Sequence, residues 1–220
     1  MRILVIGASG GIGAAMAAHA RALGASVTGL SRSGDGFDVT DEASVAGYLA
    51  ALSGEYDRIV VATGGLDVDG HRPEKSLRAL SAEALMAQFA LNAVGPALVL
   101  KHSARLLPRS RPAVFAALSA RVGSIGDNRA GGWYGYRAAK AALNQMIHTG
   151  AIELARTHPQ LTCAVLHPGT VQTPLTAAYA ARHTTIPADA AADNLWRVID
   201  GFTPADTGRF FDWAGKPVPW

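Results

Sequence analysis

The chain has 220 residues, of which 49% are hydrophobic and 17% charged, a composition typical of one well-packed globular domain and not of a disordered chain. The formal net charge of +3 is small and the lysines and arginines are scattered, so we expect neither nucleic acid nor a membrane surface as a partner. A strand-like run begins at residue 2 and no run approaches about 18 uninterrupted apolar residues, which predicts a soluble, cytoplasmic protein without a signal peptide or membrane span.

Short β-branched runs alternate with longer helical patterns. In chain order we expect a strand at 2–6, a helix at 11–23, a strand at 25–30, a brief strand at 37–39, a helix from a cap at Thr40 or Asp41 to residue 52, a strand at 58–63, a helix at 81–107, a strand at 113–118, a helix at 136–156, and strands at 161–166 and 209–213. Near-continuous apolar strands are typical of a parallel sheet covered on both faces. The predicted fold is therefore one Rossmann-type domain over residues 1–220, a doubly wound parallel α/β sheet flanked by helices.

A glycine-rich turn lies between the first expected strand and helix. It reads Gly7-Ala8-Ser9-Gly10-Gly11-Ile12-Gly13. Gly7 permits a tight turn, Gly11 lets the backbone approach a phosphate, and Gly13 lets the helix lie close to the sheet. The helix then directs free N–H groups at the ligand. A purely structural turn is the alternative, but its position at the first strand-to-helix junction favours a pyrophosphate site formed by these residues.

The end of the second strand favours one nicotinamide cofactor over the other. An acidic residue there would bind a ribose 2′-hydroxyl and repel a 2′-phosphate, whereas this chain has Ser31 and Arg32. We therefore expect NADP(H) to be preferred over NAD(H). Asp35 and Asp38 stand against this expectation, because either carboxylate could lie near the ribose. The pair Asp38-Val39 is expected at the adenine instead.

A tyrosine and a lysine four positions apart begin the helix expected near residue 136. Tyr136 and Lys140 lie on one face of a helix at that spacing. A free tyrosine, with a pKa near 10, is a poor proton donor and acceptor at neutral pH. A neighbouring ammonium and an oxidised nicotinamide both favour the phenolate, so the pair can move a proton at a carbonyl.

These motifs, in this order, resemble the short-chain dehydrogenase/reductase superfamily, and within it the small C-factor-like and sniffer-like carbonyl reductases. The resemblance spans nearly the whole chain: Gly7 to Gly13, Asp38-Val39, Gly64, Asn92, Ser119 to Ile125, Tyr136 to Lys140, and Pro168-Gly169 followed by Val171 and Thr173. It implies that Tyr136 is the acid/base, that Lys140 also holds the nicotinamide ribose, and that Asn92 anchors a water in a proton relay. It also implies that the segment from Pro168 to Thr173 borders the nicotinamide.

The sequence departs from this family at three places. The usual Asn-Asn-Ala-Gly after the fourth strand is Val61-Ala62-Thr63-Gly64, and the serine before the lysine is Ala139. The serine that normally hydrogen-bonds the substrate carbonyl aligns with Ala120. Ser124, Ser119 or an ordered water could replace it, and losing one such donor typically costs about 10²–10³ in rate. A reductase is therefore still expected, with Ser124 as a candidate catalytic residue.

The predicted function is an NADP(H)-preferring oxidoreductase acting on a small carbonyl or alcohol. The alternative is a cofactor-binding sensor or signalling protein of the same fold with little turnover, which Ala120 supports, and a quinone or imine substrate is a third possibility. The histidines show no metal-ligand spacing with a carboxylate, so no metal is expected. Residues 174–188 resemble the family's substrate lid. The helix at 81–107 presents an apolar face of the kind that the family often uses to form homodimers or homotetramers.

Overall fold

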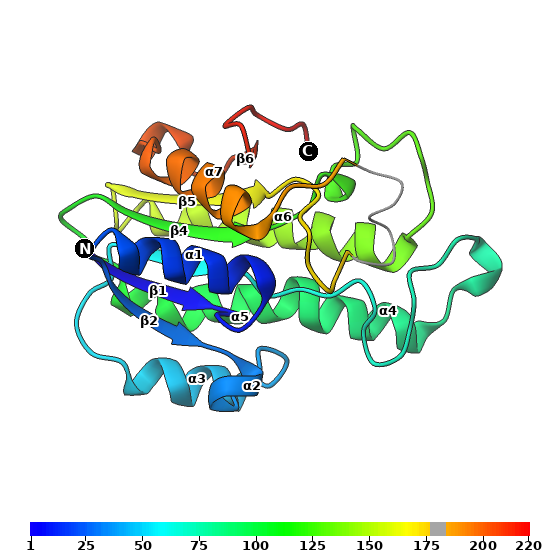
Figure 1. The fold of residues 1–220 in the computed structure, drawn as a ribbon, viewed down its shortest axis with the longest axis horizontal. Coiled ribbons are helices and arrows are strands. Elements are labelled where there is room, and N and C mark those ends of the chain that lie inside the picture. The colour runs from blue at the N-terminus through cyan, green and yellow to red at the C-terminus, as the bar shows by residue number, and fades with distance from the viewer. Residues whose placement is uncertain (177–183) are drawn as a thin grey trace.

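The computed structural model describes residues 1–176 and 184–220. Six parallel strands form one sheet in the order β2-β1-β3-β4-β5-β6 (Figure 1). The strands are β1 (Arg2–Ile6), β2 (Ser26–Leu30), β3 (Arg58–Val61), β4 (Ala113–Leu118), β5 (Leu161–His167) and β6 (Phe210–Asp212). After β2 the chain crosses to the other side of β1, where β3 to β6 are added in order. In doubly wound folds such a switch in strand order leaves a crevice at the carboxyl ends of the strands, where ligands bind. The predicted fold class is confirmed.

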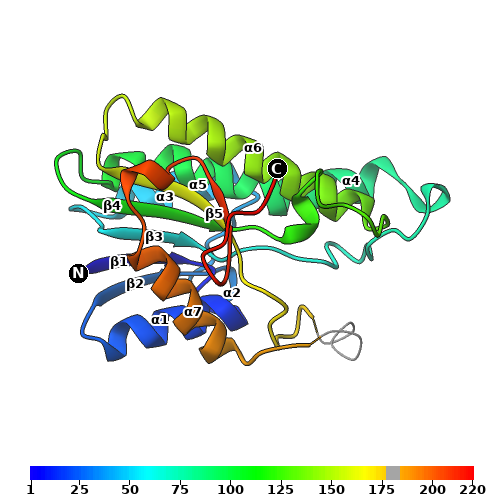
Figure 2. The ribbon, with the colours of Figure 1, turned by 90° about the horizontal axis from the view of Figure 1, so that it is seen from above.

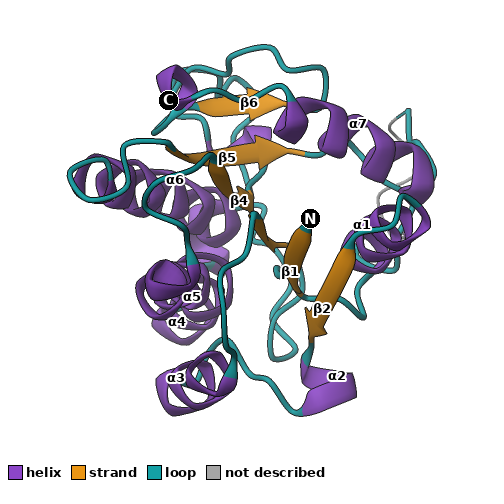
Figure 3. Ribbon diagram, turned by 90° about the vertical axis from the view of Figure 1, so that its left-hand side faces the viewer, coloured by secondary structure: helices purple, strands orange, loops and turns teal. Residues whose placement is uncertain are grey.

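Helices cover both faces of the sheet (Figures 2 and 3). They are α1 (Gly11–Ala22), α2 (Arg32–Asp35), α3 (Glu42–Ala51), α4 (Ala82–Phe89), α5 (Gly95–Ser103), α6 (Tyr134–Leu154) and α7 (Ala188–Asp200). In Figure 3, α3 to α6 lie on one face, and α1 and α7 lie on the other. A π-helical turn, Ala90–Val94, joins α4 to α5.

Alternate strand residues form two apolar cores, because successive side chains of a strand point to opposite faces. Along β1, Leu4 and Ile6 pack toward α3, α5 and α6, and Ile3 and Val5 pack toward α1 and α7. The α7 side is also held by the Trp196 indole, which donates to the carbonyl of Met16 at 3.0 Å. These buried cores fix the strand ends from which the site residues project.

The structure differs from the sequence predictions at residues 37–39 and at α7. Residues 37–39 form no strand, because the polar groups of Asp38 bond to nearby residues. Its amide donates to Ser44 Oγ in the first turn of α3, and its Oδ1 accepts from the amide and hydroxyl of Thr40. Helix α7 was not predicted, although Ala192, Leu195 and Ile199 have helical spacing and are fully buried.

The long apolar segment before β4 needs separate comment. The continuous helix Ala82–Leu106 has 25 residues and is long and apolar enough to cross a membrane by length and composition alone, with 44% of its most apolar window buried inside the fold. A core helix of a soluble protein passes the same test, and this one packs against α6 and α3. Of the expected lid at 174–188, residues 177–183 lie outside the described part of the chain.

Candidate active site

The segments that follow five neighbouring strands gather the predicted residues at one edge of the sheet. They are the glycine turn after β1, Ser31 after β2, Gly64 after β3, Ala120 after β4 and Pro168-Gly169 after β5. A cavity of about 490 Å³ opens there. It is lined by Ile12, Leu66, Ser119, Ala120, Arg121, Val122, Ala130, Gly131, Trp133, Tyr136, Arg137, His167, Pro168, Gly169, Thr170, Val171, Thr173, Leu175 and Thr176.

The glycine turn has the shape that a pyrophosphate requires. Gly7 has a φ of 87°, which favours glycine. A methyl group at Gly13 would overlap the carbonyl oxygen of Gly7, and one at Gly11 would lie 2.6 Å from Thr173 Cγ2. Helix α1 begins after Gly10 without a side-chain cap, so its first N–H groups are directed out of the turn. The backbone present therefore fits a dinucleotide phosphate.

The ribose end of the predicted cofactor site lies at the short helix α2. The buried Ser31 caps this helix by accepting from the amide of Gly34 at 3.1 Å. Its own amide and hydroxyl lie 2.9 Å and 3.3 Å from Asp35 Oδ2. Arg32 is exposed. Hydrogen bonds from Thr40, with a smaller contribution from Arg32, lower the pKa of Asp38, so this carboxylate is charged at neutral pH.

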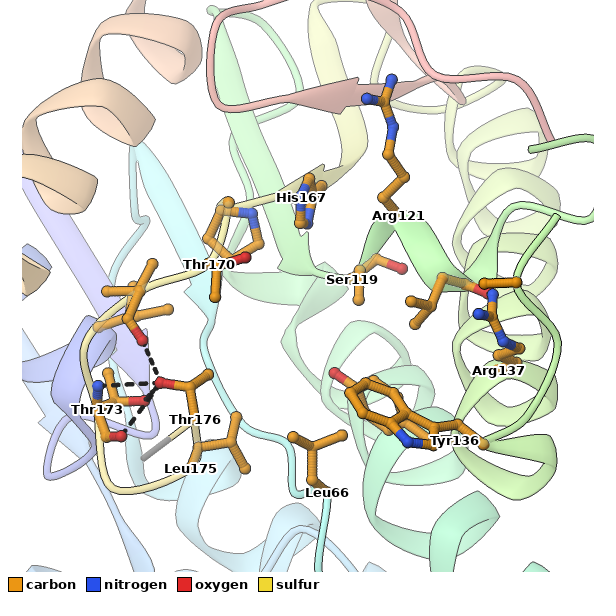
Figure 4. A pocket seen from close by; sticks show the side chains of 18 of the residues that line it. Leu66, Ser119, Arg121, Tyr136, Arg137, His167, Thr170, Thr173, Leu175 and Thr176 are labelled. Atoms are coloured by element: carbon orange, nitrogen blue, oxygen red, sulfur yellow. Dashed lines mark hydrogen bonds between the residues drawn. The ribbon is translucent and has the colours of Figure 1, made fainter. Parts of the chain in front are cut away.

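Tyr136 and Lys140 project from the first turns of α6 toward the cavity edge of β4. The Tyr136 hydroxyl points into the cavity (Figure 4). Lys140 Nζ lies 5.9 Å from the centre of the tyrosine ring and donates to the carbonyl of Leu118 at 2.9 Å. Burial raises the pKa of Tyr136 and lowers the pKa of Lys140 to about 7. In the protein alone, burial therefore opposes the expected lowering of the tyrosine pKa, because it disfavours charge on both groups.

Asn92 lies in the π-helical turn and is fully buried. Its Oδ1 accepts from the amide of Gly65 at 3.1 Å, and its Nδ2 donates to the carbonyl of Gly65 at 2.9 Å and to Gln88 Oε1 at 2.8 Å. A methyl group at Gly64 would lie 3.0 Å from Asn92 Oδ1 and 3.3 Å from Lys140 Nζ. The structure thus brings Asn92 and Lys140 together around Gly64, and the predicted water relay remains a prediction.

The candidate replacements for the missing serine have other partners. Ser119 lines the cavity, but its hydroxyl donates to Asn144 Oδ1 at 2.6 Å. Ser124 is buried, is not among the lining residues, and accepts from the amide of Asp127 at 3.1 Å. The expected hydroxyl near the substrate carbonyl is therefore not provided by Ser124 in this conformation, because that side chain closes its own turn.

His167 is a further side chain of the cavity wall. It lies at the end of β5 and lines the cavity (Figure 4). Its Nδ1 is buried and has no hydrogen-bond partner among the residues that the structure describes. Burial, assisted by the charge of Arg121 and opposed by Asp212, lowers the pKa of His167 to about 4. The imidazole is therefore neutral at physiological pH.

Sequence reasoning missed the residue that holds the start of α6. Glu74, in the loop after β3, is buried, and its Oε2 accepts from the amide of Gly135 at 3.0 Å. Its carbonyl accepts from the amide of Trp133, which has a φ of 54°. A carboxylate at the N-terminal end of a helix interacts favourably with the helix dipole. No sequence motif marks this loop contact, because Glu74 and Gly135 are far apart in the chain.

The sequence profile of the short chain dehydrogenase family matches residues 35–184. The chain belongs to this family. It is 38% identical over 136 residues to the C-signal protein of Myxococcus xanthus, covering 60% of this chain and 76% of that protein. It is 31% identical over 188 residues to 1-hydroxy-2-glutathionyl-2-methyl-3-butene dehydrogenase of Rhodococcus sp. strain AD45, covering 84% of this chain and 79% of that protein.

Solved structures of this family share the whole fold. A short-chain dehydrogenase/reductase structure from Burkholderia multivorans with bound NADP has a TM-score of 0.79 and 26% identity, covering 100% of this chain and 99% of that one. The chain is accordingly an NAD(P)-dependent oxidoreductase of the short-chain dehydrogenase family, as its motifs predicted.

Proposed function

We propose that this short-chain dehydrogenase is an NADPH-preferring carbonyl reductase or alcohol dehydrogenase whose acid/base is Tyr136. The observation that carries the proposal is the Tyr136 hydroxyl facing the cavity, with Lys140 Nζ 5.9 Å from the ring centre on the same helix face. Bound NADPH supplies the hydride. Tyr136 gives its proton to the carbonyl oxygen and takes it back in the oxidation direction.

The other predicted residues position these groups. Lys140 holds the nicotinamide ribose and, when charged, stabilises the phenolate of Tyr136. Asn92 fixes Gly65 and the π-helical turn beside Lys140. It supports the relay that reprotonates Tyr136 from the solvent after reduction and carries the proton to the solvent in the oxidation direction. Pro168 and Gly169 line the nicotinamide side of the cavity, together with Val171 and Thr173. The hydroxyl of Thr173 lies 3.4 Å from that of Thr176.

The cofactor preference rests on Arg32, because the glycine turn binds the pyrophosphate that both cofactors share. The guanidinium of Arg32 suits a 2′-phosphate because it offers charge and several donors in a fixed plane. The Burkholderia multivorans relative, whose structure contains NADP, supports the same preference. We propose that the enzyme is cytoplasmic, needs no metal, and forms a homodimer or homotetramer, which light scattering after gel filtration would test.

The test is NADPH oxidation over a panel of aldehydes, ketones and quinones. Tyr136→Phe should lower kcat at least about 10²-fold, because general acid–base catalysis typically contributes 10²–10⁴-fold. The Kd for NADPH should change less than about twofold, because the phenyl ring is retained. Tyr134→Phe is the matched control, since it removes a hydroxyl from the same helix outside the cavity lining. Equal activity of Tyr136→Phe and wild type would refute the assignment.

A sensor with little turnover is the second candidate, and Ala120 is the observation that favours it. The cavity has no serine at this position, and the C-signal relative carries a signalling name. Ala120→Ser separates the two readings. If the enzyme lacks only this donor, the variant should turn over about 10²- to 10³-fold faster than wild type, the range known for one oxyanion donor. NADPH binding without turnover in both proteins, on every panel member, would favour the sensor.

A further inference from the structure

A carboxylate lies beside the Ser31 donors that the proposed site would offer to a 2′-phosphate. The amide of Ser31 donates to Asp35 Oδ2 at 2.9 Å, and the Ser31 hydroxyl lies 3.3 Å from the same oxygen. Ser31 directly follows β2, which is the position where an acidic group accepts a ribose hydroxyl and repels a 2′-phosphate. Asp35 is four residues further on, but α2 brings its carboxylate back to that position.

The structure holds Asp35 in this place from both sides. Gly36 ends α2 with a φ of 76°, which turns the chain sharply. The hydroxyl of Tyr48, in α3, donates to the backbone carbonyl of Asp35. The ring of Tyr48 meets the buried Phe37 edge-on, with ring centres 5.6 Å apart. The backbone of Asp35 is therefore held in place, and its exposed carboxylate is held by the two Ser31 donors.

Arg32 does not neutralise this carboxylate. Among the ion pairs of the described residues, none joins Arg32 to Asp35. The same turn of helix therefore presents a cation that attracts a 2′-phosphate and an anion that repels it. The anion also occupies the amide and hydroxyl of Ser31, two donors that a phosphate would otherwise use.

We propose that Asp35 is a specificity-determining residue that limits the preference for NADPH, so that the enzyme binds NADH as well. The inference rests on the proposed cofactor site. A carboxylate about 5 Å from a 2′-phosphate of charge near −2, in solvent and at physiological salt, weakens binding by about fivefold. The 2′-hydroxyl of NADH has no charge to repel and can donate to the same carboxylate.

The test is calorimetric titration of wild type and Asp35→Asn with NADPH and NADH. Asparagine keeps an oxygen for the amide of Ser31 and removes the charge. The Kd for NADPH should fall about fivefold at low salt and less at high salt, and the Kd for NADH should change less than about twofold. Asp35→Ser, which also lacks the charge, should shift the ratio in the same direction. Arg32→Ala should weaken NADPH alone.

A matched control exists on the far edge of the sheet. Asp206 Oδ2 accepts from the amide and hydroxyl of Thr203 at 3.0 Å and 2.9 Å, the same capping arrangement next to β6. Asp206→Asn should leave the Kd values for NADPH and NADH unchanged. It therefore shows whether removing the charge of a capping carboxylate away from the cofactor site affects cofactor binding.

Two further probes isolate the 2′ position from the rest of the cofactor. Adenosine 2′,5′-bisphosphate should bind Asp35→Asn about fivefold more tightly than wild type, and adenosine 5′-monophosphate should bind both equally. An unchanged NADPH/NADH ratio in Asp35→Asn would overturn the inference alone. Failure of wild type to bind either dinucleotide would overturn the proposed function and the inference with it.

Discussion

His167 should make the folded state of this dehydrogenase less stable at acidic pH. Burial in the cavity wall lowers the pKa of this imidazole to about 4, against an ordinary value of 6.5 in an unfolded chain. Between these two values the unfolded chain binds a proton that the folded chain does not. Acid therefore favours the unfolded state, and the free energy of unfolding should fall as the pH falls from about 7 toward 4.

The size of the effect follows from the shift. The difference between a pKa of about 4 in the folded protein and 6.5 in the unfolded chain corresponds to about 3 kcal/mol when it is fully expressed. Between pH 8 and pH 5 only part of it is lost, about 2 kcal/mol by linkage. Total stabilities of about 5–15 kcal/mol make such a loss measurable. The charge of Arg121 adds to the shift and that of Asp212 opposes it, so both must be kept intact.

The assay is urea unfolding of wild type and His167→Gln at pH 8 and pH 5. The glutamine variant loses packing equally at both pH values, so this loss cancels in the comparison. Wild type should lose about 2 kcal/mol more than the variant on going to pH 5. Thr170→Val, which changes another cavity residue without a titratable group, should keep the wild-type slope. Equal losses for wild type and His167→Gln would show that the pKa of this imidazole is not lowered in the folded protein.

Three further changes test the glycine turn and the start of α6. Gly13→Ala should abolish NADPH binding in calorimetry, because the methyl group overlaps the backbone of the turn. Gly11→Ala should weaken NADPH binding, and combining it with Thr173→Ser should restore part of the loss, because serine lacks the methyl group that lies 2.6 Å from the new carbon. Glu74→Ala should destabilise the protein by about 1–3 kcal/mol in urea unfolding, since the buried amide of Gly135 loses its acceptor, whereas Glu74→Gln should cost less.

Features encoded in short, contiguous stretches were predictable from the sequence. The turn from Gly7 to Gly13 needs glycine for steric reasons that hold wherever it folds, and the spacing of Tyr136 and Lys140 fixes their common face on any helix. The helix at 188–200 was also readable from the spacing of its buried residues, although it was not predicted. The brief strand expected at 37–39 was wrong because local side-chain hydrogen bonds replaced a sheet partner.

Contacts between distant segments were not predictable in this way. Nothing in the sequence shows that the Ser119 hydroxyl bonds to Asn144 or that Glu74 holds the amide of Gly135. The buried position of Ser124 likewise depends on the turn in which its hydroxyl accepts from the amide of Asp127. Pairings of this kind are set by packing of the complete sheet, so sequence reasoning could name the candidates for the missing hydroxyl without choosing among them.

The side chains of the cavity indicate which substrates can be reduced although Ala120 replaces the usual serine. The Ser119 hydroxyl is already engaged by Asn144, and the guanidinium of Arg137 donates to backbone carbonyls of the cavity rim, including those of Gly131 and Gly132. In the proposed reaction, Tyr136 is the side chain that donates to the carbonyl oxygen of the substrate. A carbonyl that is already electron-poor needs less help at its oxygen in the transition state. Quinones and activated ketones should therefore lose less from the missing serine than simple ketones, and the substrate range should be biased toward them.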